Sequence, residues 1–307
     1  MSAKTAPKTA PKAPAKAAAP AKAAVAKVAL PADVSADNRI AKCFAELQAA
    51  GKKAFIAYLC AGDPTIDATV ELVVEMAEQA DPAKRVDIIE LGIPYSDPMA
   101  DGPANQAACE RALSSGASVK VVLDAVRRIR IRSQVPLLFF TYLNPVLRYG
   151  TEKFAKDALA AGADGVLLLD LPPEVDPSVF ATFRKVGLAT VCLAAPTTTA
   201  ERRSFLASES RGFLYYVCRL GVTGERAELP KDLAAQVKAL KAACPAPVCV
   251  GFGISTPEHA AAAAKVSDGA IVGSHLVRLI ERHGKARDLA KVVAQRAGEM
   301  AAAVHSL

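Results

Sequence analysis

The sequence predicts an α/β fold in which eight parallel strands alternate with helices and close into a (β/α)8 TIM barrel. Short apolar runs recur along the chain and are continuous, as expected of parallel strands that are buried on both faces. Between these runs lie longer segments whose apolar residues recur at three- and four-residue spacing, which is typical of helices. The 307 residues also suit one barrel of about 250 residues together with a tail.

The apolar runs and the periodic segments fix the expected order of elements. The predicted strands are residues 54–60, 86–91, 136–142, 165–169, 189–193, 213–218, 248–251 and 270–273. The clearest helical periods lie in residues 65–79, 119–132, 153–160 and 231–242. An extra helix at 37–50 precedes the first strand and would cover the bottom of the barrel. A doubly wound open sheet is the competing architecture, but closure leaves no exposed strand edge.

Residues 1–36 differ in composition from the rest, and we expect a disordered tail ahead of one catalytic domain at residues 37–307. Residues 1–30 hold six lysines and no acid, so only +1 of the net charge of +7 belongs to the remaining chain. A segment of Ala, Lys, Pro and Thr cannot bury enough apolar area to offset the entropy lost on ordering. A targeting peptide is less favoured, because no arginine precedes Arg39 and no apolar core with a cleavage site follows.

The composition also excludes several classes of function. A near-neutral body lacks the basic face that nucleic-acid binding requires. No stretch approaches the roughly 20 apolar residues of a membrane helix, so a soluble protein is expected. The seven cysteines form no CxxC pair and indicate reduced core thiols in a cytoplasmic protein. The four histidines lack ligand spacing, so no metal site is expected.

Glu90 is the first candidate for chemistry, because active sites of such barrels lie at the C-terminal ends of the strands. It stands in the apolar run 88–93, where a carboxylate is costly unless it is paired or used. Desolvation would raise its pKa and suit it to proton transfer near neutral pH. The alternative is a structural pair with an arginine.

Asp97 and Asp101 follow Glu90 in a loop rich in proline and glycine. An aspartate before proline or glycine is ordinary turn chemistry, so the residues alone favour a structural interpretation of both.

Glycines after the seventh and eighth strands suggest a phosphate-binding site. The two segments are Gly-Phe-Gly-Ile-Ser at 251–255 and Gly-Ser-His at 273–275. Their glycines would let backbone N–H groups and a helix N-terminus approach an anion, although tight turns are the simpler alternative.

A third segment, Gly-Val-Thr-Gly at 221–224, suits a mobile lid. No lysine ends a strand, so Schiff-base chemistry lacks its nucleophile. The residues alone therefore support cofactor-free proton transfer on a phosphorylated substrate.

In this order, these segments resemble the α subunit of tryptophan synthase from about residue 37 to the end. The most specific match is Glu-Leu-Gly-Ile-Pro-Tyr-Ser-Asp-Pro at 90–98 with Ala-Asp-Gly-Pro at 100–103. Further matches lie at 58–64, 142–145, 170–172, 221–224 and 251–255. The resemblance implies a carbon–carbon lyase that cleaves indole-3-glycerol phosphate to indole and glyceraldehyde 3-phosphate by a retro-aldol reaction.

The resemblance also assigns roles to single residues. Glu90 matches the acid–base that protonates C3 of the indole ring, and Asp101 matches the residue that holds the indole N–H. Thr223 matches the lid threonine that contacts this aspartate. The implied substrate pocket comprises Tyr58, Phe140, Leu167, Leu169 and Tyr215. The implied phosphate site comprises Gly224, Phe252, Gly253, Gly273 and Ser274.

Finally, the resemblance implies a partner. The family's α subunit binds a β subunit in an α2β2 tetramer, and indole passes through a tunnel to the β subunit, which joins it to serine. The pyridoxal phosphate (PLP) would belong to the β subunit, so no cofactor is expected in this chain. Segments 97–98 and 142–148 match contact surfaces.

The alternatives are a free-standing indole-releasing lyase, a non-catalytic activator of the β subunit, and a different phosphate-binding barrel isomerase. The chain departs from the family pattern at Cys60, where threonine is common, at Cys218 and Leu220, and in its tail.

Overall fold

The computed structural model describes Met1 and residues 37–218, 230–251 and 253–307. The tail predicted at 1–36, apart from Met1, and the lid predicted at 221–224 lie outside these residues. In the described part, nine parallel strands form one sheet in the order β5-β4-β3-β2-β1-β9-β8-β7-β6. The strands are β1 (Ala54–Cys60), β2 (Ile88–Gly92), β3 (Leu137–Thr141), β4 (Gly165–Leu168), β5 (Ala189–Thr190), β6 (Cys192–Ala194), β7 (Leu214–Val217), β8 (Val248–Gly251) and β9 (Gly269–Val272).

The sheet closes because β5 and β6 are two halves of one strand that is divided at Val191. β5 pairs with β4, whereas β6 pairs with β7. The Val191 N–H donates to the carbonyl of Val166 at 3.0 Å, so the divided strand stays attached to β4 across the break. The strand predicted at 189–193 thus joins both ends of the sheet. The predicted eight-stranded barrel is confirmed, and the open sheet is wrong.

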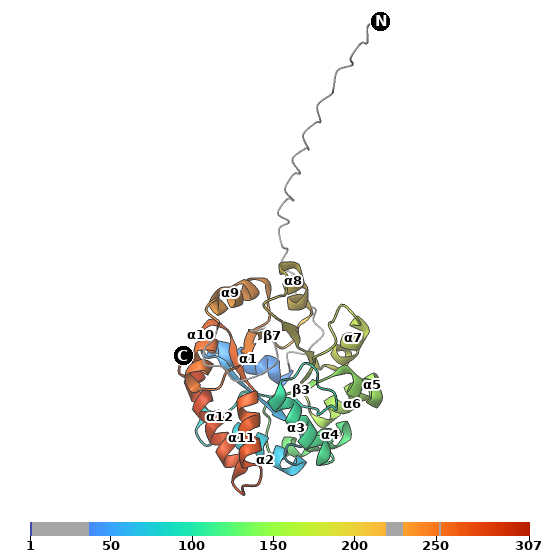
Figure 1. The fold of residues 1–307 in the computed structure, drawn as a ribbon. Coiled ribbons are helices and arrows are strands. Elements are labelled where there is room, and N and C mark those ends of the chain that lie inside the picture. The colour runs from blue at the N-terminus through green and yellow to red at the C-terminus, as the bar shows by residue number, and fades with distance from the viewer. Residues whose placement is uncertain (2–36, 219–229, 252) are drawn as a thin grey trace.

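Helices surround this barrel (Figure 1). Those in the described part are α1 (Arg39–Ala49), α2 (Ile66–Ala77), α3 (Pro103–Ser114), α4 (Val119–Arg130), α5 (Leu143–Tyr149), α6 (Thr151–Ala161), α7 (Pro177–Val186), α8 (Ala200–Glu209), α9 (Leu233–Ala243), α10 (Pro257–Val266), α11 (Ser274–His283) and α12 (Leu289–His305), with a 3-10 turn η1 (Pro82–Lys84). None of the helices in residues 37–218, 230–251 and 253–307 has the length and hydropathy needed to span a membrane.

The extra helix α1 covers one end of the barrel, as predicted. Its N-cap residue Asn38 accepts a hydrogen bond from the N–H of Ile40 at 3.0 Å. Ile40 and Phe44 are buried among inward-facing strand residues such as Ile56 and Ile88. Figure 1 shows α1 inside the ring that the other helices form.

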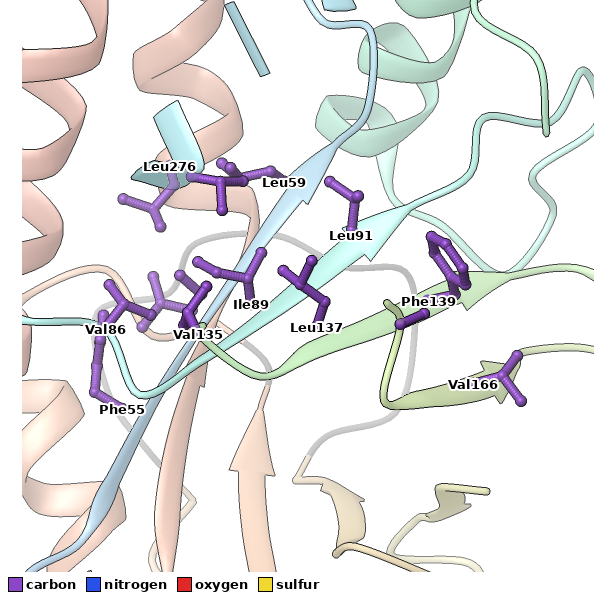
Figure 2. Close-up of a cluster of buried hydrophobic side chains, with 14 of the residues drawn as sticks. Phe55, Leu59, Val86, Ile89, Leu91, Val135, Leu137, Phe139, Val166 and Leu276 are labelled. Atoms are coloured by element: carbon purple, nitrogen blue, oxygen red, sulfur yellow. The ribbon is translucent and has the colours of Figure 1, made fainter. Parts of the chain in front are cut away.

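Side chains on each strand alternate between the barrel interior and the helical layer, because successive residues of a strand point to opposite faces. On β2, Ile89 and Leu91 join the outer core, whereas Ile88 joins the inner one. Figure 2 shows outer side chains of four neighbouring strands, among them Leu59, Ile89, Leu91, Phe139 and Val166. The alternation directs Glu90 into the barrel.

Candidate active site

Glu90 lies inside the barrel and is only 1% exposed. Its Oε1 atom is buried without a hydrogen-bond partner, and no lysine or arginine of the described ranges forms an ion pair with it. Burial raises the pKa of Glu90 to about 8, because desolvation disfavours the charged form. The alternative of a structural pair with an arginine is therefore not supported. A carboxyl group in this setting holds its proton at neutral pH and can donate it.

Glu90 opens onto a cavity at the C-terminal ends of the strands. The cavity is lined by Tyr58, Glu90, Asn105, Phe140, Tyr215, Gly253, Ile254, Ile271, Gly273 and Ser274. Tyr58 and Glu90 are register partners on β1 and β2. The rings of Tyr58 and Phe140 meet edge to face with their centroids 4.9 Å apart, so they form an aromatic wall beside the carboxyl group.

Larger hollows lie near the opposite end of the barrel and do not carry comparable chemistry. In one of them, beside the C-terminus of α1, Lys53 and Lys241 both pair with Asp268. The Asp268 carboxylate also accepts the N–H of Val248 at 3.0 Å, so it satisfies a backbone donor at the start of β8.

Asp101 precedes α3 and is 3% exposed. Its Oδ2 accepts a hydrogen bond from the Tyr142 hydroxyl at 2.8 Å, and its Oδ1 accepts one from the Asn105 amide at 3.2 Å. Burial raises the pKa of Asp101, although both hydrogen bonds oppose that rise. With one donor on each oxygen, the carboxylate keeps lone pairs free for a further N–H donor.

Two glycines of the sequence motifs make room for the tyrosines of the cavity. A Cβ atom on Gly92 would lie 2.7 Å from the Tyr58 hydroxyl, and one on Gly251 would lie 2.2 Å from the Tyr215 hydroxyl. Both distances are well below van der Waals contact, so a Cβ at either position would require the tyrosine to shift. Burial raises the pKa of both tyrosines well above the usual value, and the Glu90 charge adds to the rise at Tyr215.

We expect Gly251→Ala to destabilise the chain by about 1–3 kcal/mol, the usual cost of an overpacked core, and to slow substrate turnover. The new methyl group displaces Tyr215 from the cavity. Thermal unfolding followed by circular dichroism, together with initial rates, measures both effects. Adding Tyr215→Phe should recover part of the stability, since the hydroxyl is the atom nearest the new methyl group. An unchanged melting temperature in the single variant would contradict this packing.

The cavity also reaches the N-terminus of α11. Gly273 is the N-cap and Ser274 the first residue of this helix, and no side chain caps its first N–H groups. Gly253 adopts a left-handed backbone with φ of 77°, which glycine tolerates without strain. An anion at this end of the cavity would meet unpaired N–H groups and the positive end of the helix dipole.

The structure brings together most of the residues expected at the site. Tyr58, Glu90, Phe140, Tyr215, Gly253, Gly273 and Ser274 line the cavity, and Asp101 contacts it through Asn105. Leu167 is buried deeper, in the inner core, and Leu169 is packed at its border. Thr223, Gly224 and Phe252 lie outside the described residues. No group of three or more His, Cys, Asp or Glu in the described ranges is placed to hold a metal ion.

Two residues of the site, Asn105 and Tyr142, were not predicted from the sequence. Asn105 lines the cavity, donates to Asp101, and has a buried Oδ1 without a partner. The hydroxyl of Tyr142 accepts the N–H of Ala100 at 3.0 Å and donates to Asp101. The spacing of four residues between Asp101 and Asn105, typical of neighbours on a helix, was the available signal for Asn105.

The chain is similar to known proteins over most of its length. The family described as "Tryptophan synthase alpha chain" matches residues 44–305. The tryptophan synthase alpha chain of Geobacter sulfurreducens is 47% identical over 245 residues, which cover 80% of this chain and 91% of that protein. The alpha chain of Solibacter usitatus is 49% identical over 252 residues, which cover 82% and 92% of the two chains.

Solved structures show the same likeness. Tryptophan synthase subunit alpha from Legionella pneumophila superposes with a TM-score of 0.80 at 39% identity, covering 88% of this chain and 99% of that one. A chain of Mycobacterium tuberculosis tryptophan synthase gives a TM-score of 0.79 at 36% identity, with coverage of 87% and 98%. The chain therefore belongs to the tryptophan synthase alpha chain family.

Proposed function

We propose that this chain cleaves indole-3-glycerol phosphate into indole and glyceraldehyde 3-phosphate, with Glu90 and Asp101 as its catalytic residues. The observation that carries the proposal is the Glu90 carboxyl group, which is buried, unpaired and protonated near neutral pH at the wall of an aromatic cavity. Asp101 lies at the same end of the barrel, on the loop that follows β2.

In this proposal Glu90 moves protons in two steps. Its carboxyl group first donates a proton to C3 of the indole ring, which leaves a positive charge on the ring nitrogen. The resulting carboxylate then accepts the proton of the neighbouring glycerol hydroxyl. The C–C bond breaks as that oxygen becomes a carbonyl, and its electrons restore the aromatic ring. Glu90 ends protonated again, so the cycle balances without a cofactor.

Asp101 is proposed to accept the indole N–H and to stabilise the charge that develops on this nitrogen. A carboxylate held by Tyr142 and Asn105 is preorganised for that task, because it need not reorient as the charge forms. Thr223 would contact it from the lid.

The remaining site residues are proposed to orient the substrate. The apolar wall for the indole ring comprises Tyr58, Phe140, Leu167, Leu169 and Tyr215. The phosphate site comprises Gly224, Phe252, Gly253, Gly273 and Ser274. The N-terminus of α11 supports this assignment, since helix N-termini favour phosphate.

We further propose a cytoplasmic α2β2 complex in which the β subunit carries the PLP and receives the indole for L-tryptophan synthesis. Segments 97–98 and 142–148 would contact the β subunit. Met99 and Leu147, which lie beside or within these segments, are large apolar side chains exposed by 86% and 53%, as expected of a surface that a partner covers.

The decisive experiment is an indole-release assay of the purified chain with and without a β subunit. We expect slow release by the chain alone and faster release when the β subunit is added. Full turnover by the chain alone, at a rate that the β subunit does not change, would favour a free-standing lyase. The absence of release under both conditions, with the β reaction still stimulated, would favour a non-catalytic activator.

We also propose that residues 37–307 form the catalytic domain and that the preceding tail is dispensable for turnover. Deleting residues 2–30 should leave the indole-release rate and the melting temperature unchanged. A matched deletion that extends through Phe44 should lower the melting temperature, because it removes Ile40 and Phe44 from the inner core. A slower rate after the shorter deletion would contradict the proposed division.

A further inference from the structure

Two buried thiols face each other beside the candidate active site. Cys60 is the last residue of β1, and Cys109 lies in α3, with their Sγ atoms 3.9 Å apart. The two residues are 2% and 4% exposed and share a cluster with Tyr58 and Ala108.

The two thiols have different environments. Cys60 donates a hydrogen bond to the sulfur of Cys109, which also accepts the backbone N–H of Tyr95. The hydrogen bond from Cys60 lowers the pKa of Cys109 despite its burial. The same bond and burial raise the pKa of Cys60. Cys109 is thus the better nucleophile of the pair, and Cys60 is a thiol held next to it.

We propose that Cys60 and Cys109 form a redox-sensitive dithiol, which hydrogen peroxide converts into a disulfide. The Cys109 thiolate attacks one peroxide oxygen, the O–O bond breaks, and the departing oxygen leaves as water after taking a proton. The resulting sulfenic acid is attacked by the sulfur of Cys60. A disulfide forms, the S–O bond breaks, and the oxygen leaves as a second water with the Cys60 proton.

The position of the pair supports access by a small oxidant. Asn105 lines the cavity and lies one helical turn before Cys109, on the same face of α3. Tyr58, which lines the cavity from β1, lies two residues before Cys60. The thiols therefore sit directly behind the cavity wall.

Closure of the disulfide would act on Asp101. The two sulfurs must approach from 3.9 Å to about 2.05 Å, which draws α3 toward β1. The first turn of α3 carries Asn105, whose amide holds Asp101. A shift of this turn displaces the Asp101 carboxylate and slows cleavage. This effect on turnover rests on the proposed function, whereas formation of the disulfide does not.

The first test maps disulfides in the full chain after mild treatment with hydrogen peroxide. Thiol titration in denaturant should fall from the seven free thiols of the reduced chain to five. Trypsin should release peptide 54–84 joined to peptide 86–111 with the loss of two hydrogens, and dithiothreitol should separate them. The inference is overturned if other thiols oxidise first, or if Cys109 is oxidised without becoming linked to Cys60.

The second test measures turnover before and after peroxide. We expect the parent to slow by roughly tenfold or more, since displacements near 1 Å can cost about a hundredfold, and to recover with dithiothreitol. Cys109→Ser and Cys60→Ser should each keep their own starting rate. Cys192→Ser, which removes a buried thiol of β6 outside the pair, should remain as sensitive as the parent.

An equal loss of rate in Cys109→Ser and in the parent would overturn the link between this pair and turnover. If the reduced parent chain releases no indole, the proposed function is contradicted. The peptide map would still show whether the disulfide forms, because it does not depend on turnover.

Discussion

Glu90→Gln is expected to slow indole release from indole-3-glycerol phosphate by roughly a thousandfold or more at pH 7, since positioned acid–bases contribute about 10²–10⁴. Glutamine keeps the size and burial of the side chain but has no proton to donate to C3. Rates of indole release measure the loss. Binding of glycerol 3-phosphate, followed by calorimetry, should be unchanged, because the anion end of the cavity lies at Gly253 and α11. Substantial residual turnover would exclude Glu90 as the acid.

The same substitution separates loss of chemistry from loss of fold. The raised pKa of Glu90 means that the folded chain binds this proton more tightly than the unfolded chain. Stability is therefore lost as pH rises from the unfolded value toward about 8, by about 1.4 kcal/mol per pH unit. Glutamine carries no such cost. The Glu90→Gln variant should melt at a higher temperature than the parent, by a margin that grows from pH 5 to pH 8.

The parent should show the matching pH dependence of turnover. The protonated carboxyl group is the active form, so the rate should fall as pH rises through about 8. A rate that stayed constant to pH 9 would contradict the assignment of Glu90 as the acid.

The barrel was predictable because its strands are continuous apolar runs, and burial on both faces imposes that pattern. The division of this strand into β5 and β6 at Val191 was not predictable, because no residue type in the sequence marks the break. It arises where the strand changes partners from β4 to β7. The strand predicted at 86–91 is observed at Ile88–Gly92.

Asp87 illustrates what sequence patterns cannot show. Its carboxylate accepts the N–H of Phe55 at the start of β1. Asp164 and Asp268 likewise precede their strands and accept the N–H groups of Leu137 and Val248 on neighbouring ones. Each bond joins residues at least 20 positions apart. No local spacing reveals such bonds, although together they satisfy strand ends at the bottom of the barrel.

The site residues likewise divide into those that the sequence alone predicts and those that it does not. Glu90 was predictable from the residues, because a carboxylate inside an apolar strand is costly unless it is used. Asp101 was not, since its neighbours resemble those of any turn. Its distinguishing contacts come from Tyr142, 41 residues away, and from Asn105, whose position becomes meaningful only once α3 is known to begin at Pro103.

Asp101→Asn is the second substitution with a large expected effect, a slowing of indole release of about a hundredfold or more, as for loss of one stabilising group in other active sites. Asparagine keeps the shape of the side chain and can still accept one hydrogen bond, but it removes the negative charge. The charge matters most when the indole nitrogen becomes positive, and the asparagine oxygen can still accept the indole N–H, so kcat should fall much more than KM rises.

Two further variants decide whether the charge of Asp101 or its place in the loop matters. Tyr142→Phe removes one donor from the Asp101 carboxylate and should slow turnover less than Asp101→Asn, because the charge remains. Asp97→Asn, at an exposed position of the same loop, should leave the rate of the chain assayed without a β subunit unchanged. If Asp101→Asn raised KM and left kcat intact, Asp101 would only bind the substrate. If neither parameter changed, it would be a turn residue, as its immediate neighbours in the sequence suggest.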